Sequence, residues 1–206
     1  QRGLATKYLM EEIDPRCDPL GPGNKLIIAT GPLTGTMAST GGRWSAVTKG
    51  PLTGAIACSN SGGQFGGELK MAGWDMIILE GRSPRPVYLY VEDDHAELHD
   101  ATHLWGRSVW ETEPAIKEAH GDPLIRIASI GEAGEQGVRY ACIVNDLHRA
   151  AGRSGVGAVM GSKQLKAIAV RGTVGVKVAN PKAFLHAVNA ATTALAKSEG
   201  RMGFTR

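Results

Sequence analysis

The sequence has few aromatic residues, little net charge and no long apolar run for its 206 residues. Aromatic side chains make up 5% of the chain, which does not suit a surface that stacks many nucleic-acid bases. The formal net charge is +3 and the basic residues are spread along the chain, which argues against a nucleic-acid partner. We find no signal peptide and no apolar run long enough to span a bilayer, so we expect no membrane partner either.

Cysteine is also scarce. The three cysteines, Cys17, Cys58 and Cys142, lie far apart and form no C-x-x-C pair. This spacing argues against an iron–sulfur cluster or a structural zinc ion held by this chain alone. An odd number of cysteines without a disulfide framework is typical of a reducing compartment, so we expect a cytoplasmic protein.

Glycine, by contrast, is abundant, with 28 residues concentrated in a duplicated motif. Gly31-Pro-Leu-Thr-Gly35 leads to Thr40-Gly-Gly-Arg43, and Gly50-Pro-Leu-Thr-Gly54 leads to Cys58-Ser-Asn-Ser-Gly-Gly63. A third run, Asn145-Asp-Leu-His-Arg-Ala-Ala-Gly-Arg-Ser-Gly155, has a similar composition. Glycines let main-chain N–H groups approach a ligand, and arginines supply forked cationic donors. The combination predicts a site for a large, anionic, phosphate-bearing cofactor.

The apolar pattern predicts more strands than helices. Short apolar runs bounded by glycine and proline predict strands at 25–30, 44–48, 55–59, 76–80, 87–92, 96–100, 124–129, 138–144 and 167–171. Helices are predicted at 1–13, 64–71, 113–120 (with Thr112 as a candidate N-cap), 155–161 and 181–198, the last with Asn180 as N-cap and Pro181 at its first position. We therefore expect an α+β fold, a β-rich domain of two packed sheets with few short helices.

The chain also contains an internal sequence repeat. Residues 62–81 and 151–172 both run from a glycine loop through a short helix to a strand. The repeat predicts pseudo-twofold internal similarity. It also predicts two helix N-termini that attract anions, because their N–H groups lack partners within the helix.

Each candidate binding residue has an alternative interpretation. Arg43 is either an exposed arginine after a turn or a clamp on a phosphate or a polar ring. The segment 60–63 is either a simple turn or an anion site, and Arg149 and Arg153 are either a solvated charge pair or ligand contacts. The chain contains no Walker loop and no clean dinucleotide fingerprint, and we find no convincing nucleophile–base pair. We therefore assign no catalytic residue.

The order of these motifs resembles a known family. GPLTGT, TGGRW, KGPLTGAI, NSGG and then NDLHRAAGRSGVGAVMGSK follow the pattern of the N-terminal cofactor-binding domain of tungsten-dependent aldehyde:ferredoxin oxidoreductases. The resemblance runs from Arg2 to about residue 184. It implies residues 1–180 as a tungstopterin-binding domain that lacks its beginning, and residues 181–206 as the start of a following helical domain.

The resemblance implies a tungsten bis-pyranopterin whose two phosphates are joined through Mg²⁺. The positions carried over as cofactor contacts are Arg43, Asn60, Gly62, Arg149, Ala150, Gly152 and Arg153. Arg43 would also approach a [4Fe–4S] cluster, whose ligands are expected in later domains. The main-chain carbonyl groups of Asn60 and Ala150 would ligate the Mg²⁺ ion, which prefers oxygen ligands.

By the same resemblance, the chain is the cofactor-binding segment of an enzyme that oxidises aldehydes to carboxylic acids. This segment alone is not expected to be active. The implied partners are the remaining domains of the enzyme, an aldehyde, ferredoxin or a related iron–sulfur subunit, and a second copy of the chain in a homo-oligomer. Two alternatives stay open: a subunit of a tungsten-dependent benzoyl-CoA reductase, and a non-catalytic module that binds a pterin or a nucleotide.

Overall fold

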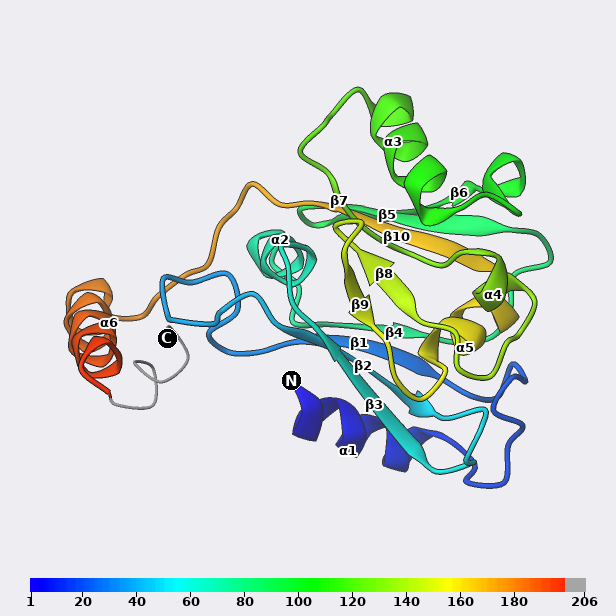
Figure 1. The fold of residues 1–206 in the computed structure, drawn as a ribbon, viewed down its shortest axis with the longest axis horizontal. Coiled ribbons are helices and arrows are strands. Elements are labelled where there is room, and N and C mark those ends of the chain that lie inside the picture. Colours follow the sequence, from blue (N-terminus) through cyan, green and yellow to red (C-terminus); the bar gives the residue numbers. More distant parts are fainter. Residues whose placement is uncertain (199–206) are drawn as a thin grey trace.

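The computed structural model describes residues 1–198, which form six α-helices and ten strands in two sheets (Figure 1). The helices are α1 (Arg2–Glu12), α2 (Phe65–Met71), α3 (Val109–His120), α4 (Glu132–Glu135), α5 (Val156–Ser162) and α6 (Pro181–Ala196), with a 3-10 turn, η1 (Thr102–Leu104). The strands are β1 (Leu26–Thr30), β2 (Trp44–Lys49), β3 (Ile56–Ser61), β4 (Met76–Leu79), β5 (Val87–Glu92), β6 (His95–Asp100), β7 (Arg126–Ser129), β8 (Ile143–Asn145), β9 (Arg149–Ala151) and β10 (Leu165–Arg171).

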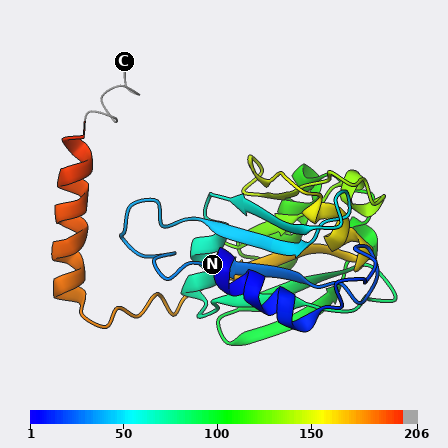
Figure 2. The same cartoon turned by 90° about the horizontal axis from the view of Figure 1, so that it is seen from below.

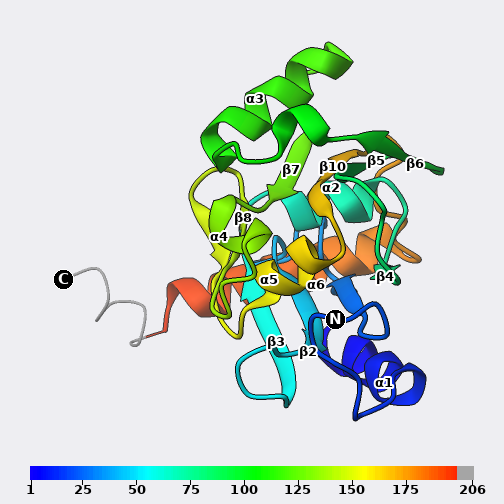
Figure 3. The same cartoon turned by 90° about the vertical axis from the view of Figure 1, so that its right-hand side faces the viewer.

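The two sheets enclose a layer of short helices. The four-stranded sheet has the order β3-β2-β1-β4, and the six-stranded sheet has the order β6-β5-β10-β7-β8-β9. Helices α2 and α5 lie between the sheets and contact both of them, while α1 covers the outer face of the smaller sheet and α3 that of the larger one (Figures 1 and 3). The expected α+β architecture of two packed sheets is confirmed.

This layering explains why the central strands are largely apolar on both faces. In β1, Leu26 and Ile28 face the helical layer, whereas Ile27 faces α1 on the other side. In β10, Ile168 faces inward and Ala167 faces the cluster under α3. A strand covered on both faces reads as a continuous apolar run rather than as an alternating one.

The internal sequence repeat corresponds to a duplicated topology. The first half runs β1-β2-β3-α2-β4 and the second runs β7-β8-β9-α5-β10, and in each half the strands are ordered third, second, first, fourth. The hairpin β5–β6 lies between the halves in sequence and extends only the larger sheet. Equivalent loops, after β3 and after β9, therefore precede the two buried helices.

Two local predictions were wrong, and helix α4 and strand β9 were not predicted. The strand predicted at 138–144 is formed only at Ile143–Asn145, because residues 138–142 turn around the first residues of α5 and Ala141 O accepts from Gly157 N. Helix α3 begins at Val109, so its N-cap is Ser108, with a capping box to Glu111, rather than Thr112. Strand β9 was not predicted, since its three residues carry no strand pattern of their own.

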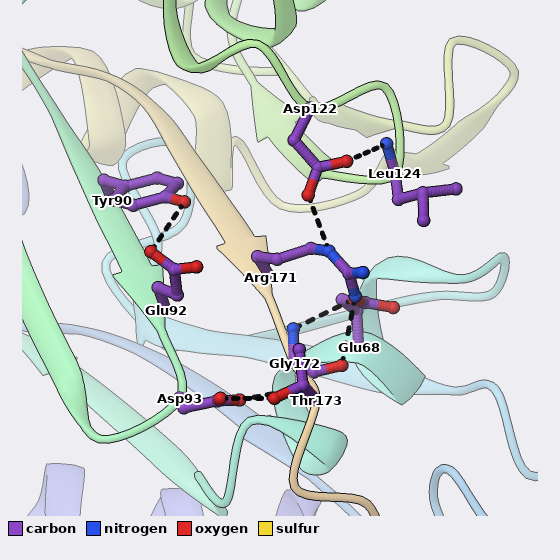
Figure 4. A network of polar contacts seen from close by, with 9 residues as sticks. All are labelled: Glu68, Tyr90, Glu92, Asp93, Asp122, Leu124, Arg171, Gly172 and Thr173. Atoms are coloured by element: carbon purple, nitrogen blue, oxygen red, sulfur yellow. Dashed lines mark hydrogen bonds and ion pairs between the residues drawn. The ribbon is translucent and has the colours of Figure 1, made fainter.

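The carboxyl end of β10 is fixed by a polar network (Figure 4). Arg171 Nε donates to Asp122 Oδ2 at 2.7 Å, and Arg171 Nη1 donates to Glu68 Oε1 at 3.1 Å. Thr173 N and Oγ1 both donate to the carboxylate of Asp93 at 2.6 Å. The network joins β10 to α2, to the turn before β7 and to the β5–β6 turn, and so fixes the point at which the chain leaves the sheets.

Beyond this point the chain extends to α6, which stands apart from the two sheets (Figure 2). Asn180 caps the helix by accepting from Ala183 N at 3.0 Å, and Pro181 occupies the first turn, as predicted. No residue of α6 is buried. That the segment begins a second domain stays a prediction, and residues 199–206 lie outside the described part. Within residues 1–198, none of the helices has both the length and the apolar character needed to cross a membrane.

A cluster of aromatic and imidazole rings lies between the larger sheet and α3. His120 stacks on Tyr90 with ring centroids 3.9 Å apart, and its Nε2 lies 2.9 Å from Tyr88 Oη. His99 stacks on Tyr88 at 5.0 Å. Burial, together with repulsion from His99, lowers the pKa of His120 below its usual value of 6.5.

The low pKa of His120 gives the fold a dependence on pH. The folded state binds this proton less readily than the unfolded chain does. The free energy of unfolding is therefore unaffected by His120 above pH 6.5, and it decreases as the pH drops toward the lower folded-state pKa of His120. When the pH is lowered from about 7.5 to about 5.5, we expect the thermal midpoint to decrease, and to decrease less in His120→Phe than in the unchanged protein. Identical slopes in the two proteins would contradict this assignment.

Candidate cofactor-binding site

Five of the seven predicted binding residues line one polar cavity of about 400 Å³. Arg43 comes from the start of β2, Asn60 from β3, and Ala150, Gly152 and Arg153 from β9 and the loop after it. These positions are up to 110 residues apart in sequence (43 to 153). They meet because β3 and β9, the third strands of the two halves, lie side by side (Figure 1).

The cavity carries a concentrated positive charge. Three arginines, Arg2, Arg43 and Arg153, line the cavity. Within the described residues, no aspartate or glutamate lines it. Within residues 1–198 none of these three arginines pairs with a carboxylate, whereas Arg171 has two such partners. Unneutralised guanidinium groups around one cavity suit an anionic guest, because each is a strong donor to phosphate oxygens.

The side chain of Asn60 is committed to holding the site together. Its Oδ1 accepts from Arg43 Nη1 at 2.6 Å, and its Nδ2 donates to Trp44 O at 2.9 Å. Asn60 therefore orients the Arg43 guanidinium and ties it to β2, which carries Trp44.

Strands β3 and β9 are edge strands in the described part of the chain, so main-chain N–H and C=O groups on one side of each have no partner in a sheet. Each of these strands pairs with only one neighbour, β2 or β8, so one side of each has no ladder partner. The two edges are joined near the cavity, where Arg153 N donates to the buried Ser59 Oγ at 3.0 Å. Asn60 and Ala150 thus occupy equivalent positions, near the ends of the two third strands, and both line the cavity.

The remaining two predicted residues flank the cavity. Gly62 accepts at its carbonyl oxygen from Asn145 Nδ2 at 2.9 Å. Arg149 begins β9, is exposed, and lies opposite Asn145 in the β8–β9 hairpin. The structure therefore places all seven residues around one region, five in the cavity wall and two beside it.

The prediction that α2 offers an open anion site at its N-terminus is wrong. The carboxylate of Asp146 accepts from Gln64 N at 2.6 Å and from Phe65 N at 3.4 Å. In the first turn of α5, Val156 and Gly157 are buried and Gly157 N already donates to Ala141 O. The positive charge of the cavity wall comes from its arginines.

Sequence reasoning missed three wall residues, Arg2, Cys58 and Ser59. Arg2 belongs to α1 and reaches the cavity only because α1 packs across β1 and β2, which no local pattern predicts. The unpaired arginines, the absence of carboxylates from the described wall and the available strand edges fit the phosphates and the oxygen-ligated cation of the cofactor that the resemblance implies.

Comparisons with known proteins identify relatives of this chain. A tungsten-containing aldehyde ferredoxin oxidoreductase from Thermococcus kodakarensis is 61% identical over 184 residues, which are 89% of this chain and 30% of that protein. A protein of the same description from Pyrococcus furiosus is 59% identical, with the same coverage. In structure, the chain matches a benzoyl coenzyme A reductase, solved as the active-site complex BamBC with 1,5-dienoyl-CoA, with a TM-score of 0.88 and 43% identity over 91% of this chain and 28% of that one.

The chain therefore spans about 30% of the length of the curated relatives that it matches. A family model described as "Aldehyde ferredoxin oxidoreductase, N-terminal domain" matches residues 1–172, which include the whole of both sheets and every residue of the cavity wall. The chain belongs to the aldehyde ferredoxin oxidoreductase family, as its N-terminal domain.

Proposed function

We propose that this chain is the part of an aldehyde-oxidising enzyme that binds a tungsten bis-pyranopterin cofactor. The observation that carries the proposal is the cavity of about 400 Å³ in which three arginines, none with a carboxylate partner within residues 1–198, face the edges of β3 and β9. The names of the relatives, which are tungsten-containing oxidoreductases, support the choice of cofactor.

The seven residues divide into three roles. Arg43, Arg149 and Arg153 would bind the phosphate and pterin groups through charge-assisted hydrogen bonds. Gly62 and Gly152 carry no side chain, and an added Cβ would meet nothing closer than about 3.8 Å at either position. Both positions therefore leave room for a ligand to approach the main chain.

The carbonyl oxygens of Asn60 and Ala150 would hold Mg²⁺ between the two phosphates. Carbonyl oxygens are ordinary ligands of hard cations, and Mg²⁺ is commonly shared between a protein and substrate phosphates. The duplicated topology of the two halves supports this role, because it brings comparable positions on the third strands, Asn60 on β3 and Ala150 on β9, to one cavity wall.

When bound, the cofactor would supply the two-electron chemistry that converts an aldehyde and water into a carboxylic acid, with the electrons leaving through a [4Fe–4S] cluster to ferredoxin or a related iron–sulfur protein. The residues of this chain would anchor and orient the cofactor and tune its charge. The cluster ligands and the acid–base groups are expected in the remaining domains of the same enzyme. We also propose a cytoplasmic location, which the three free thiols Cys17, Cys58 and Cys142 support, and assembly with a second copy of the chain.

Arg149→Ala in the full-length protein tests the proposal. Loss of a charge-assisted contact worth about 1.5–3 kcal/mol is expected to weaken retention of the cofactor by about ten- to a hundredfold. Tungsten per chain, measured by elemental analysis after dialysis, should fall accordingly. Arg16→Ala is the matched control, since the Arg16 side chain is 90% exposed and lies away from the cavity wall. Unchanged tungsten content in Arg149→Ala would contradict the assignment.

The alternative is a tungsten-dependent benzoyl-CoA reductase subunit, which the TM-score of 0.88 to a benzoyl coenzyme A reductase favours. The higher identity to aldehyde oxidoreductases, 61% against 43%, favours aldehyde oxidation. An assay of the purified full-length protein against aldehydes and against aryl-CoA thioesters separates the two functions. Reduction of an aryl-CoA without oxidation of any aldehyde would support the alternative.

A further inference from the structure

The two halves of the cavity are joined by a pair of adjacent side chains, Asn145 and Asp146, at the end of β8. Asn145 is fully buried, and its Oδ1 accepts from Ser61 Oγ at 2.7 Å. Its Nδ2 donates to Gly62 O at 2.9 Å and to Asp146 Oδ2 at 2.7 Å. One amide therefore connects the second half of the fold to the end of β3 and to the loop after it.

Asp146 completes the connection. Its Oδ2 receives the N–H groups of Gln64 and Phe65, which open α2. An aspartate at a helix N-terminus accepts from N–H donors that have no partner inside the helix. Its negative charge also interacts favourably with the positive end of the helix dipole. The carboxylate thus takes the place that an external anion would otherwise occupy.

The backbone around this pair is built for close approach. Asp146 and Leu147 have φ of 49° and 57°, so the β8–β9 turn holds two consecutive residues in the left-handed region. Gly63 has φ of 85°, and a Cβ there would collide with Asp146 Oδ2. The turn leads directly into Arg149, whose Cγ would lie 3.1 Å from the same Cβ. The loop after β3 and the hairpin that carries Arg149 therefore fit against each other with no spare room.

We propose that Asn145 and Asp146 are positioning residues that lock the two cofactor-binding loops, 60–64 and 149–153, into one preformed site. Neither side chain lines the cavity, so they act through Ser61, Gly62 and Arg149 rather than by touching the cofactor. The role in cofactor retention rests on the proposed function, whereas the mechanical coupling of the two loops does not. Groups that orient the direct ligands of a metal site typically change its affinity by about 10–100-fold when they are removed.

The test compares four forms of the full-length protein: the unchanged protein, Asp146→Gly, Asp146→Asn and Ser108→Ala. Glycine removes the carboxylate and accepts the positive φ without strain, and asparagine keeps an oxygen that can accept from Gln64 N. Ser108→Ala removes a comparable N-cap from α3, on the outer face of the larger sheet, and is the matched control for lost stability.

Two measurements are made on each protein: tungsten and magnesium per chain after dialysis, and amide hydrogen exchange of the loops 60–65 and 145–153 in cofactor-free protein. We expect about a tenfold or larger loss of both metals from Asp146→Gly, retention in Asp146→Asn, and retention in Ser108→Ala despite its lower thermal midpoint. Exchange should become faster in both loops of Asp146→Gly and in neither loop of Ser108→Ala.

Full retention of the metals by Asp146→Gly would overturn the positioning role, as would equal loss from Asp146→Asn or from Ser108→Ala. Unchanged exchange in either loop of Asp146→Gly would overturn the coupling itself. If the unchanged protein binds no tungsten, the proposed function fails. Faster exchange confined to the two loops of Asp146→Gly would then still support the coupling between them.

Discussion

Gly157→Ala is expected to lower the thermal midpoint of the protein by about 6–12 °C, which corresponds to about 3 kcal/mol in the free energy of unfolding. Gly157 lies in the first turn of α5, between the two sheets, and is buried. A Cβ added there would collide with the carbonyl oxygen of Cys142 and lie 2.7 Å from the carbonyl carbon of the same residue. Because these atoms belong to the main chain, the clash cannot be relieved by a change of rotamer.

The same substitution should also disturb the cofactor site. Helix α5 follows directly on the loop that contains Gly152 and Arg153, so a displaced α5 moves one wall of the cavity. We expect reduced tungsten content in the full-length variant together with the lower midpoint.

Gly3→Ala is the matched control for Gly157→Ala. Gly3 is exposed in α1, and an added Cβ would meet nothing within 4 Å. Gly3 is the second residue of α1, and in a helix this change should stabilise the protein by up to about 0.5–1 kcal/mol. The same substitution thus has opposite expected signs at the two positions. A midpoint of Gly157→Ala equal to that of the unchanged protein would show that α5 is not held against Cys142 as the structure describes.

Lys166→Ala is expected to have the second large effect, a loss of about 3–5 kcal/mol in the free energy of unfolding. Lys166 lies on β10 and forms an ion pair with Glu135 of α4, and the two side chains are 0% and 1% exposed. Lys166 Nζ also donates to Arg107 O at 2.6 Å, and Glu135 Oε2 accepts from Gly106 N at 2.8 Å. Removing the lysine would leave a buried carboxylate without its counter-charge.

A double-mutant cycle measures the coupling in this pair. Lys166→Met combined with Glu135→Leu should cost less than the sum of the two single changes, because no unpaired charge then remains buried. Lys7→Ala, which breaks the exposed Lys7–Glu11 pair, is the control and should change stability by less than about 1 kcal/mol. Strict additivity of the two changes at 135 and 166 would contradict a buried pair.

Much of the fold could be predicted from local sequence. The strands of the centre are apolar runs of the right length, and the β5–β6 hairpin was predicted within one residue at one end. The cap of α6 follows from Asn180 and Pro181 alone, because an N-cap side chain and a proline in the first turn act within one turn of the chain. The family motifs, and with them the seven binding residues, are also local signals.

The site was predicted less completely, since its remaining parts depend on contacts between distant segments. Arg2 joins the cavity through the packing of α1 on the smaller sheet, and Asp146 reaches α2 across 82 residues of sequence. Nothing near Lys166 in the sequence indicates that its charge is buried against Glu135.

By itself, the sequence determined most of the elements, their duplication, the family and the residues proposed to approach the cofactor. Those properties rest on short-range preferences and on motif order. Only the tertiary structure decided that β3 and β9 meet at their edges, that Asp146 caps α2 and that, within residues 1–198, three arginines of the cavity wall have no carboxylate partner. Each of these depends on which surfaces of the two halves pack together, which hydrophobic burial between the sheets fixes and local sequence does not.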